Sequence, residues 1–218
     1  MKPLLVINLG STSSKVGIFH QKQCVQKETI KHLAIDLAPY NKIMDQLNFR
    51  KEKIEGWIQS CGYTLDDFEC FCVRGALIKP LESGIYRVNK QMIDEILSEV
   101  YASHVTNVGM VLGYLWSNQT GKECVFVNAP STDELSSLAR YTGIKGIERR
   151  TAFHALNQKQ IALDYAQSVH LDVDQLKLIV VHLGGGISVG AHLYGKIVDV
   201  SNALDGEGCM SAEYHCTL

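Results

Sequence analysis

An α/β fold with a mixed sheet is the fold class that the sequence predicts, and three observations lead to it. Short apolar runs typical of buried strands alternate with longer stretches of helical periodicity. A strand, a turn rich in glycine or hydroxyl residues and a second strand follow one another twice, once near each end of the chain. The 218 residues, 46% of them hydrophobic and 20% charged, are enough to bury a sizeable core. This length corresponds to about one and a half domains.

The first strand–turn–strand unit opens the chain. Residues 4–7 have the continuous apolar pattern of a buried strand, and residues 15–19 predict a second strand. Between them, residues 8–14 are rich in Asn, Gly, Ser and Thr, which favour turns. The unit therefore predicts a hairpin with an unusually polar tip.

Helices and short strands fill the middle of the chain. Apolar residues at 54, 57 and 58 predict a helix that stops at Gly62, and Asn89 is the predicted N-cap of a helix with apolar residues between 92 and 100. Further helices are expected near residues 106–117, 132–142 and 151–169, and short strands at 67–73 and 123–127.

The second strand–turn–strand unit lies in the last third of the chain. Residues 178–181 predict a buried strand, followed by a glycine-rich turn and by further strands at 187–193 and 197–200. The residues from Ile7 to Gly10 align with those from Val181 to Gly184, 174 positions further along. We interpret this match as a weak internal duplication, with two similar halves that face each other.

Charge and hydropathy exclude two kinds of partner. Twenty-one Lys and Arg against 23 Asp and Glu give a net charge of -2, and the longest basic run is Arg149-Arg150. We therefore expect neither nucleic acid nor an anionic membrane as a partner. The apolar run at residues 4–7 is far shorter than the ~20 residues that span a bilayer, and shorter than a signal-peptide core. The expected location is the cytoplasm.

Seven cysteines, an odd number spread along the chain, predict free thiols in a reducing compartment. Cys70 and Cys72 alternate with Phe68 on one face of the predicted strand. They are either small core thiols or metal ligands. The first interpretation is favoured because no second ligand pair at zinc-like spacing accompanies them.

The two turns have the composition of phosphate-binding loops. Glycine tolerates a positive φ and has no Cβ, so backbone N–H groups can converge on an anion. A flexible hairpin tip is the alternative for each turn alone, whereas a matched pair favours a clamp on the phosphates of a nucleotide. Neither turn is a Walker A loop or a dinucleotide fingerprint. The candidate ligands are Ser11, Ser13, Ser14 and Lys15 in the first turn, and Gly184, Gly185, Gly186 and Ser188 in the second.

The turns resemble the phosphate-binding hairpins of the acetate and sugar kinase, Hsp70 and actin superfamily, and further segments resemble the butyrate kinase family. The resemblance implies duplicated ribonuclease H-like (actin-like ATPase) domains with mixed sheets. It places an acyl-kinase domain at residues 1–173 and the start of an incomplete second nucleotide-binding domain at 174–218. The segments that carry it are Arg74 to Pro80, Asn107 to Gly109, Asp133 to Leu135, Phe153 to Lys159, His182 to Gly190, and Asn202 to Gly208.

This resemblance implies transfer of the γ-phosphoryl group of ATP to butyrate, which yields butyryl phosphate and ADP, with Mg²⁺ as cofactor. The implied acid is butyrate or isobutyrate, the implied context is fatty acid metabolism, and homo-oligomers are expected. The family places an Asn at the Mg²⁺ and phosphate turn, which is Asn8 here, with Gly10, Ser11, Ser13 and Lys15 around the phosphates.

Two residues match catalytic positions of the family. Arg74 matches an arginine aimed at the acyl carboxylate and the migrating phosphate, and His182 matches a histidine that donates to the phosphoryl oxygens in the transition state. From the residues alone, Asn8 is also a turn former, Arg74 a surface residue and His182 a core histidine. His154 is architectural or catalytic, and the family's acetate kinase branch has an aspartate where this chain has Arg150, so that role does not carry over.

The end of the sequence departs from the family. Asp205 and Glu207 either shape a loop or contact Mg²⁺ through water. Residues 209–218 lose the family pattern, and Tyr214 stands where the family has a second active-site arginine. The adenosine pocket and a metal-binding carboxylate of the family would follow, so we expect this chain to have little or no kinase activity. The alternatives are a non-catalytic phosphate-binding or regulatory module, and an actin-like or Hsp70-like switch, which the segment from Phe153 to Lys159 disfavours.

Overall fold

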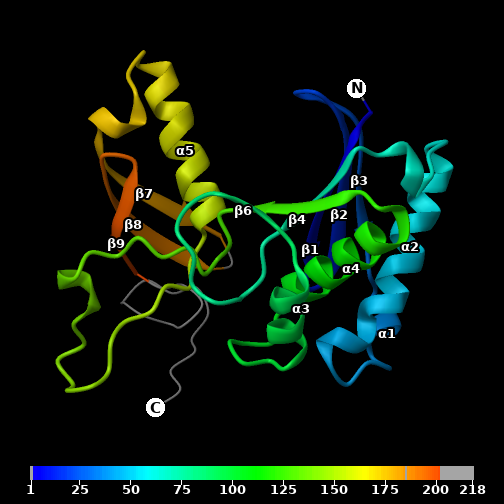
Figure 1. Cartoon of the computed structure of the whole chain (residues 1–218), viewed down its shortest axis with the longest axis horizontal. Helices are drawn as coiled ribbons and strands as arrows, with labels where there is room; N and C mark the ends of the chain where they lie inside the picture. The colour runs from blue at the N-terminus through cyan, green and yellow to red at the C-terminus, as the bar shows by residue number, and fades with distance from the viewer. Residues whose placement is uncertain (1, 185, 202–218) are drawn as a thin grey trace. The chain divides into compact units, whose positions relative to one another are not determined.

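The computed structural model describes residues 2–184 and 186–201. Contacts divide the chain into two units, coloured along the chain in Figure 1. Unit 1 comprises Met1–Lys79 and Ile85–Val127, and unit 2 comprises Pro80–Gly84 and Asn128–Leu218. Each unit is described by itself. These units are defined by contacts and differ from the two domains predicted at 1–173 and 174–218. The predicted domain boundary stays a prediction.

A six-stranded mixed sheet forms the centre of unit 1, with the strand order β3-β2-β1-β4-β6-β5. The β1, β4 and β6 strands are parallel, and the remaining pairs are antiparallel. The strands are β1 (Leu4–Gly10), β2 (Ser13–His20), β3 (Gln23–Lys31), β4 (Cys70–Arg74), β5 (Ile85–Arg87) and β6 (Glu123–Val127).

Alternation along the central strands gives this sheet two different faces. Leu5, Ile7 and Leu9 of β1 are buried on one face, which we call the helix face because α4 packs there against β1, β4 and β6. The intervening residues of β1 lie on the other face, which we call the open face. The helices are α1 (Ala34–Leu37), α2 (Leu47–Ser60), α3 (Lys90–Leu97) and α4 (Val105–Thr120).

Unit 2 is built on an antiparallel sheet with the order β7-β8-β9. These strands are Lys177–Leu183, Ile187–Leu193 and Lys196–Val200, and α5 (Ala155–Ser168) packs on β7. A long connection precedes α5 and holds one short 3-10 helix at Leu138–Arg140. One buried cluster of this unit consists of Leu135, Ala139, Phe153, Ala155, Ile197 and Val200.

Both predicted hairpins and most predicted elements are present, but one helix is wrong. The region 132–142 forms no α-helix, because backbone N–H groups near its start bond to residues outside the region. The N–H of Asp133 donates to the carbonyl of Leu81, and the N–H of Ser136 donates to the carbonyl of Val198. The strand expected from residue 67 begins only at Cys70, so Phe68 is buried outside it.

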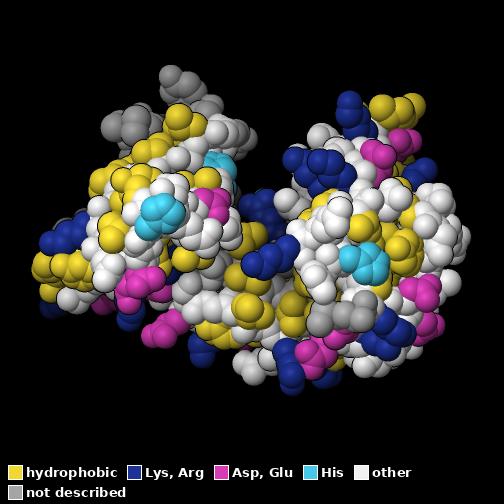
Figure 2. All heavy atoms as spheres, turned by 90° about the horizontal axis from the view of Figure 1, so that it is seen from above, with side chains coloured by type: hydrophobic (Ala, Val, Ile, Leu, Met, Phe, Trp, Pro, Cys, Tyr) yellow, Lys and Arg dark blue, Asp and Glu magenta, His cyan; other side chains and the backbone are white. Residues whose placement is uncertain are grey.

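Two surface features complete the description. No helix within the described ranges is long and apolar enough to cross a membrane. In the view of Figure 2, basic and acidic side chains are interspersed on both units instead of gathering in one patch.

We predict that Gly113→Ala destabilises unit 1. A Cβ at this position of α4 would lie 2.5 Å from Cys124 Sγ and 2.7 Å from Val73 Cγ1, so the helix must move away from the sheet. The expected cost is about 1–3 kcal/mol in urea unfolding. Gly56→Ala in α2 is the matched control: its Cβ meets nothing within 4 Å, and we expect a gain of about 0.5–1 kcal/mol from helix propensity. Equal stabilities of the two variants would contradict this packing.

Candidate functional site

Strand pairing brings three predicted residues into one row on the open face of unit 1. Asn8 of β1 pairs with Lys15 of β2. Ile7 pairs with Val73 of β4, so Asn8 lies level with Arg74, the next residue of that strand. Because neighbouring strands are about 4.8 Å apart, Lys15, Asn8 and Arg74 occupy adjacent positions across three strands. We call this set the Lys15–Asn8–Arg74 row.

The row places an amide between two cations. Asn8 and Lys15 are exposed and Arg74 is half-buried. Burial lowers the pKa of Arg74 below its ordinary value. The pKa of His104 is also lowered, mainly by burial and to a smaller extent by the Arg74 guanidinium. Within the described ranges no carboxylate pairs with Arg74. The guanidinium fork is thus available to an anion that approaches the open face.

The tip of the first hairpin adjoins this row. Gly10 pairs with Ser13, and the exposed Ser11 and Thr12 form the turn between them. Ser14 points the other way: it is fully buried on the helix face, where its Oγ lies 2.8 Å from His32 Nε2. The Ser14 hydroxyl therefore supports the turn from beneath and does not face the open side.

Gly10 and Gly184 do not have the positive φ that glycine in a phosphate-binding turn would allow. A Cβ on Gly10 would lie 3.6 Å from Ser13 O, an ordinary contact, whereas a Cβ on Gly184 would lie 3.0 Å from His182 Nε2. Glycine at these positions keeps the space beside the strand ends clear, and the turn geometry does not require it.

The second hairpin holds His182 against α5. His182 pairs with Ser188 across β7 and β8. Its Nδ1 lies 2.7 Å from Asn157 Nδ2, and its ring stacks on that of His154 with centroids 3.7 Å apart and an interplanar angle of 10°. The helix therefore fixes the orientation of the His182 ring, and Nε2 is on the side of Gly184.

Ser188 lies within a buried polar network and is not exposed to a ligand. Its exposed fraction is 0%, and its Oγ accepts from Gln158 Nε2 at 2.9 Å and lies 3.0 Å from His154 Nδ1. Gln158 is also fully buried, and His192 Nε2 donates to its Oε1 at 3.2 Å. The predicted contact between the Ser188 hydroxyl and phosphate is thus replaced by a supporting role beneath the hairpin.

Gln158 is a site-supporting residue that sequence reasoning missed. A Cβ on Gly190 would lie 2.0 Å from Gln158 Oε1, so the amide fits only because residue 190 is glycine. The signal was present in the segment from Phe153 to Lys159, where the two residues after Leu156 contact the second hairpin from one turn of α5.

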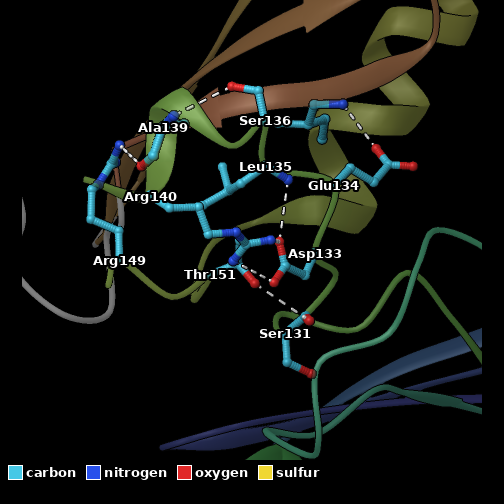
Figure 3. A network of polar contacts seen from close by, with 10 residues as sticks. Ser131, Asp133, Glu134, Leu135, Ser136, Ala139, Arg140, Arg149 and Thr151 are labelled. Carbon is cyan, nitrogen blue, oxygen red and sulfur yellow. Dashed lines mark hydrogen bonds and ion pairs between the residues drawn. The ribbon is translucent and has the colours of Figure 1, made fainter. Parts of the chain in front are cut away.

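The connection before α5 is tied to the sheet of unit 2 by a second network, shown in Figure 3. Asp133 makes a two-pronged pair with Arg140, at 2.7 and 2.8 Å. Glu134 pairs with Lys159 at 2.6 Å, with exposed fractions of 8% and 11%, and also accepts from the N–H of Ile197. Arg149 bonds Ala139 O, Asp199 and Val200 O. The Asp133 to Leu135 segment is therefore architectural.

The remaining candidates contribute less. Cys70 and Cys72 are half-buried, and a hydrogen bond between them together with burial raises the pKa of Cys72. No group of three metal-ligating side chains occurs within the described ranges. Gly186 is half-buried next to β8. Gly185, Asp205, Glu207 and Tyr214 lie outside the described residues.

Comparison with solved structures identifies the fold. The structure is similar to acetate kinase from Porphyromonas gingivalis, with a TM-score of 0.67 and 16% sequence identity over 94% of this chain and 58% of that one. It is also similar to a propionate kinase from Francisella tularensis subsp. tularensis SCHU S4, with a TM-score of 0.66, 18% identity and the same coverage. Acetate kinase from Entamoeba histolytica gives 0.65 and 17% over 92% and 55%.

These neighbours confirm the predicted fold class, α/β with mixed sheets in the arrangement of the actin-like ATPases. A scan against models of known protein families finds no match. The chain spans a little over half the length of the kinases to which it is similar.

We predict that His192 makes the stability of unit 2 depend on pH. Burial, and to a smaller extent the Lys159 ammonium, lower its pKa to about 4. Below the ordinary pKa of about 6.5, the unfolded chain takes up a proton that the folded chain does not, so stability falls as the pH decreases from 6.5 to 4. The expected contribution is about 1 kcal/mol per pH unit, measured as the difference from His192→Gln in chemical unfolding. His20→Gln, at an exposed position, should keep the wild-type slope, and parallel curves for all three proteins would contradict the prediction.

Proposed function

We propose that this chain carries the acid- and phosphate-binding parts of a short-chain carboxylate kinase, with butyrate or isobutyrate as the acceptor. The observation that carries the proposal is the Lys15–Asn8–Arg74 row beside the tip of the first hairpin. Its support is the similarity of the fold to that of acetate and propionate kinases.

In the proposed reaction the protein neutralises the charge of the phosphates and aligns the two substrates, and no covalent intermediate with the protein is required. A carboxylate oxygen of the acid attacks the γ-phosphorus of ATP, and the bond to the β-phosphate oxygen breaks, which yields an acyl phosphate and ADP. Arg74 suits the acid and the transferred group, because its planar fork binds both kinds of anion. Lys15 places a second cation on the same face, two strands away.

Mg²⁺ fits the donor set around Asn8. The exposed side chain offers one hard oxygen ligand, and Mg²⁺ commonly takes few protein ligands and completes its coordination with water and substrate phosphates. When bound, the ion would neutralise phosphate charge. Asn8 would orient the phosphates next to Arg74.

His182 is proposed to donate a hydrogen bond to the phosphoryl oxygens. If Asn157 Nδ2 donates to His182 Nδ1, the neutral imidazole carries its proton on Nε2, on the side of the glycine turn. Gly184 and Gly186 follow His182 in the sequence, and both are proposed to bind phosphate through the backbone of the turn. Homo-oligomers and a cytoplasmic location are further parts of this proposal.

A second candidate is a phosphate-binding or regulatory module without turnover. Tyr214 favours it, because the butyrate kinase pattern has an arginine there that adds a cation where transition-state charge develops.

The deciding experiment is an acyl phosphate assay on this chain. ATP, Mg²⁺ and butyrate are incubated with hydroxylamine, and acyl hydroxamate is measured, with isobutyrate and acetate in parallel. Hydroxamate formed with butyrate or isobutyrate in preference to acetate supports the kinase and contradicts our expectation that this chain has little or no kinase activity. ADP binding by calorimetry without hydroxamate supports the binding module, and the absence of both contradicts the two candidates.

We predict that Arg74→Ala raises the dissociation constant for butyrate at least tenfold and leaves that for ADP within twofold. The reason is that a charge-assisted fork to the carboxylate is lost, while the hairpin tip is unchanged. Ligand-detected NMR measures both constants. Arg87→Ala, which removes an exposed arginine that pairs with Glu123, is the control. Unchanged butyrate binding by Arg74→Ala would remove Arg74 from the site.

A further inference from the structure

A fully buried arginine lies beneath the tip of the first hairpin. Arg50 of α2 has an exposed fraction of 0%, and its guanidinium makes five hydrogen bonds. Two of them go to Gln46 Oε1, at 2.9 and 3.0 Å. The other three go to Ser11 O at 3.0 Å, Ser13 O at 3.3 Å and Ser14 Oγ at 3.2 Å.

All of these acceptors are uncharged. No ion pair joins Arg50 to a carboxylate in residues 2–184 and 186–201. Burial lowers the pKa of Arg50 to about 10, so the guanidinium stays charged at neutral pH. A buried charge without a counter-charge is costly. An anion bound at the hairpin tip would supply the missing negative charge.

The hydrogen bonds also set the direction of the peptide groups in the turn. Ser11 O points to Arg50, and a trans peptide group is planar, so the N–H of Thr12 points to the opposite side. The carbonyl of Thr12 accepts from the N–H of His32 at 2.9 Å. Three successive carbonyls, those of Ser11, Thr12 and Ser13, are thus held by donors of unit 1. The turn presents an N–H to solvent in place of repelling oxygens.

We propose that Arg50 is the positioning residue of a phosphate site at the first hairpin, and that the bound phosphate neutralises its buried charge. The inference rests on the proposed function, because it requires that a phosphate group binds at this tip. It adds a residue that would touch no substrate. Arg50 acts in two ways. Its hydrogen bonds hold the backbone of the turn, and its positive charge attracts the phosphate from the other side of the turn backbone.

Gln46→Glu is the variant that separates charge from architecture. The carboxylate can accept the same two hydrogen bonds from Arg50 and also neutralises it, so the turn should keep its shape and the unliganded protein its stability. The full chain is titrated with pyrophosphate, and the amide NMR signals of Ser11 and Thr12 report the binding. We expect at least tenfold weaker binding than in the wild type, with an equal or higher Tm. Gln59→Glu, which adds the same charge at an exposed position of α2, should stay within twofold of the wild type.

Arg50→Lys supplies the complementary measurement. It keeps the charge but not the fork, so we expect it to bind pyrophosphate more tightly than Gln46→Glu does. If the wild type binds pyrophosphate and Gln46→Glu binds it equally well, the role of Arg50 is overturned, while the phosphate site at the hairpin stands. Weaker binding by Gln46→Glu with a lower Tm would also overturn it, because distortion would then explain the loss. No response of Ser11 and Thr12 in the wild type would overturn the phosphate role of the hairpin and, with it, this inference.

Discussion

The position of β1 between β2 and β4 is the constraint on which the candidate site of unit 1 depends. Antiparallel pairing on one side sets Asn8 opposite Lys15, and parallel pairing on the other sets it level with Arg74. A slip of one residue in either ladder would move one member of the row to the helix face. Leu5, Ile7 and Leu9 prevent such a slip, because it would bring buried side chains to the open face. The apolar core of unit 1 therefore determines where the polar groups lie.

The two hairpins are supported from beneath in similar ways. Ser14 in the first and Ser188 in the second are fully buried, and each meets a histidine and one further donor from a helix. Hydrogen bonds are directional, so these buried hydroxyl groups and their partners restrict the conformation of each turn more than apolar contacts would. The similarity between the two hairpins thus extends from their glycines and strand–turn–strand order to the polar groups that hold each turn.

The helices and strands could be predicted from the sequence far better than the contacts between residues that are distant in the chain. Apolar runs located both hairpins, and Asn89 was correctly identified as a helix cap. The Lys15–Asn8–Arg74 row could not be predicted from local pattern, because residues 8 and 74 meet only through strand register. Arg50 was missed for the same reason: in the sequence it is one of several charged residues of a helix, and only the tertiary structure buries it. The helix expected at 132–142 is absent, because the Asp133 N–H donates to Leu81 and the Glu134 carboxylate pairs with Lys159, both outside this region.

Gly190 and Gln158 constrain each other in evolution. Any side chain at position 190 would overlap the amide at position 158, so a glycine-to-alanine change is tolerable only in a lineage that has already shortened residue 158. That first step passes through an intermediate in which Ser188 and His192 lose a shared partner. Substitutions at these two positions should therefore appear together among descendants of this sequence, and the order in which they arise is restricted by the packing of two atoms.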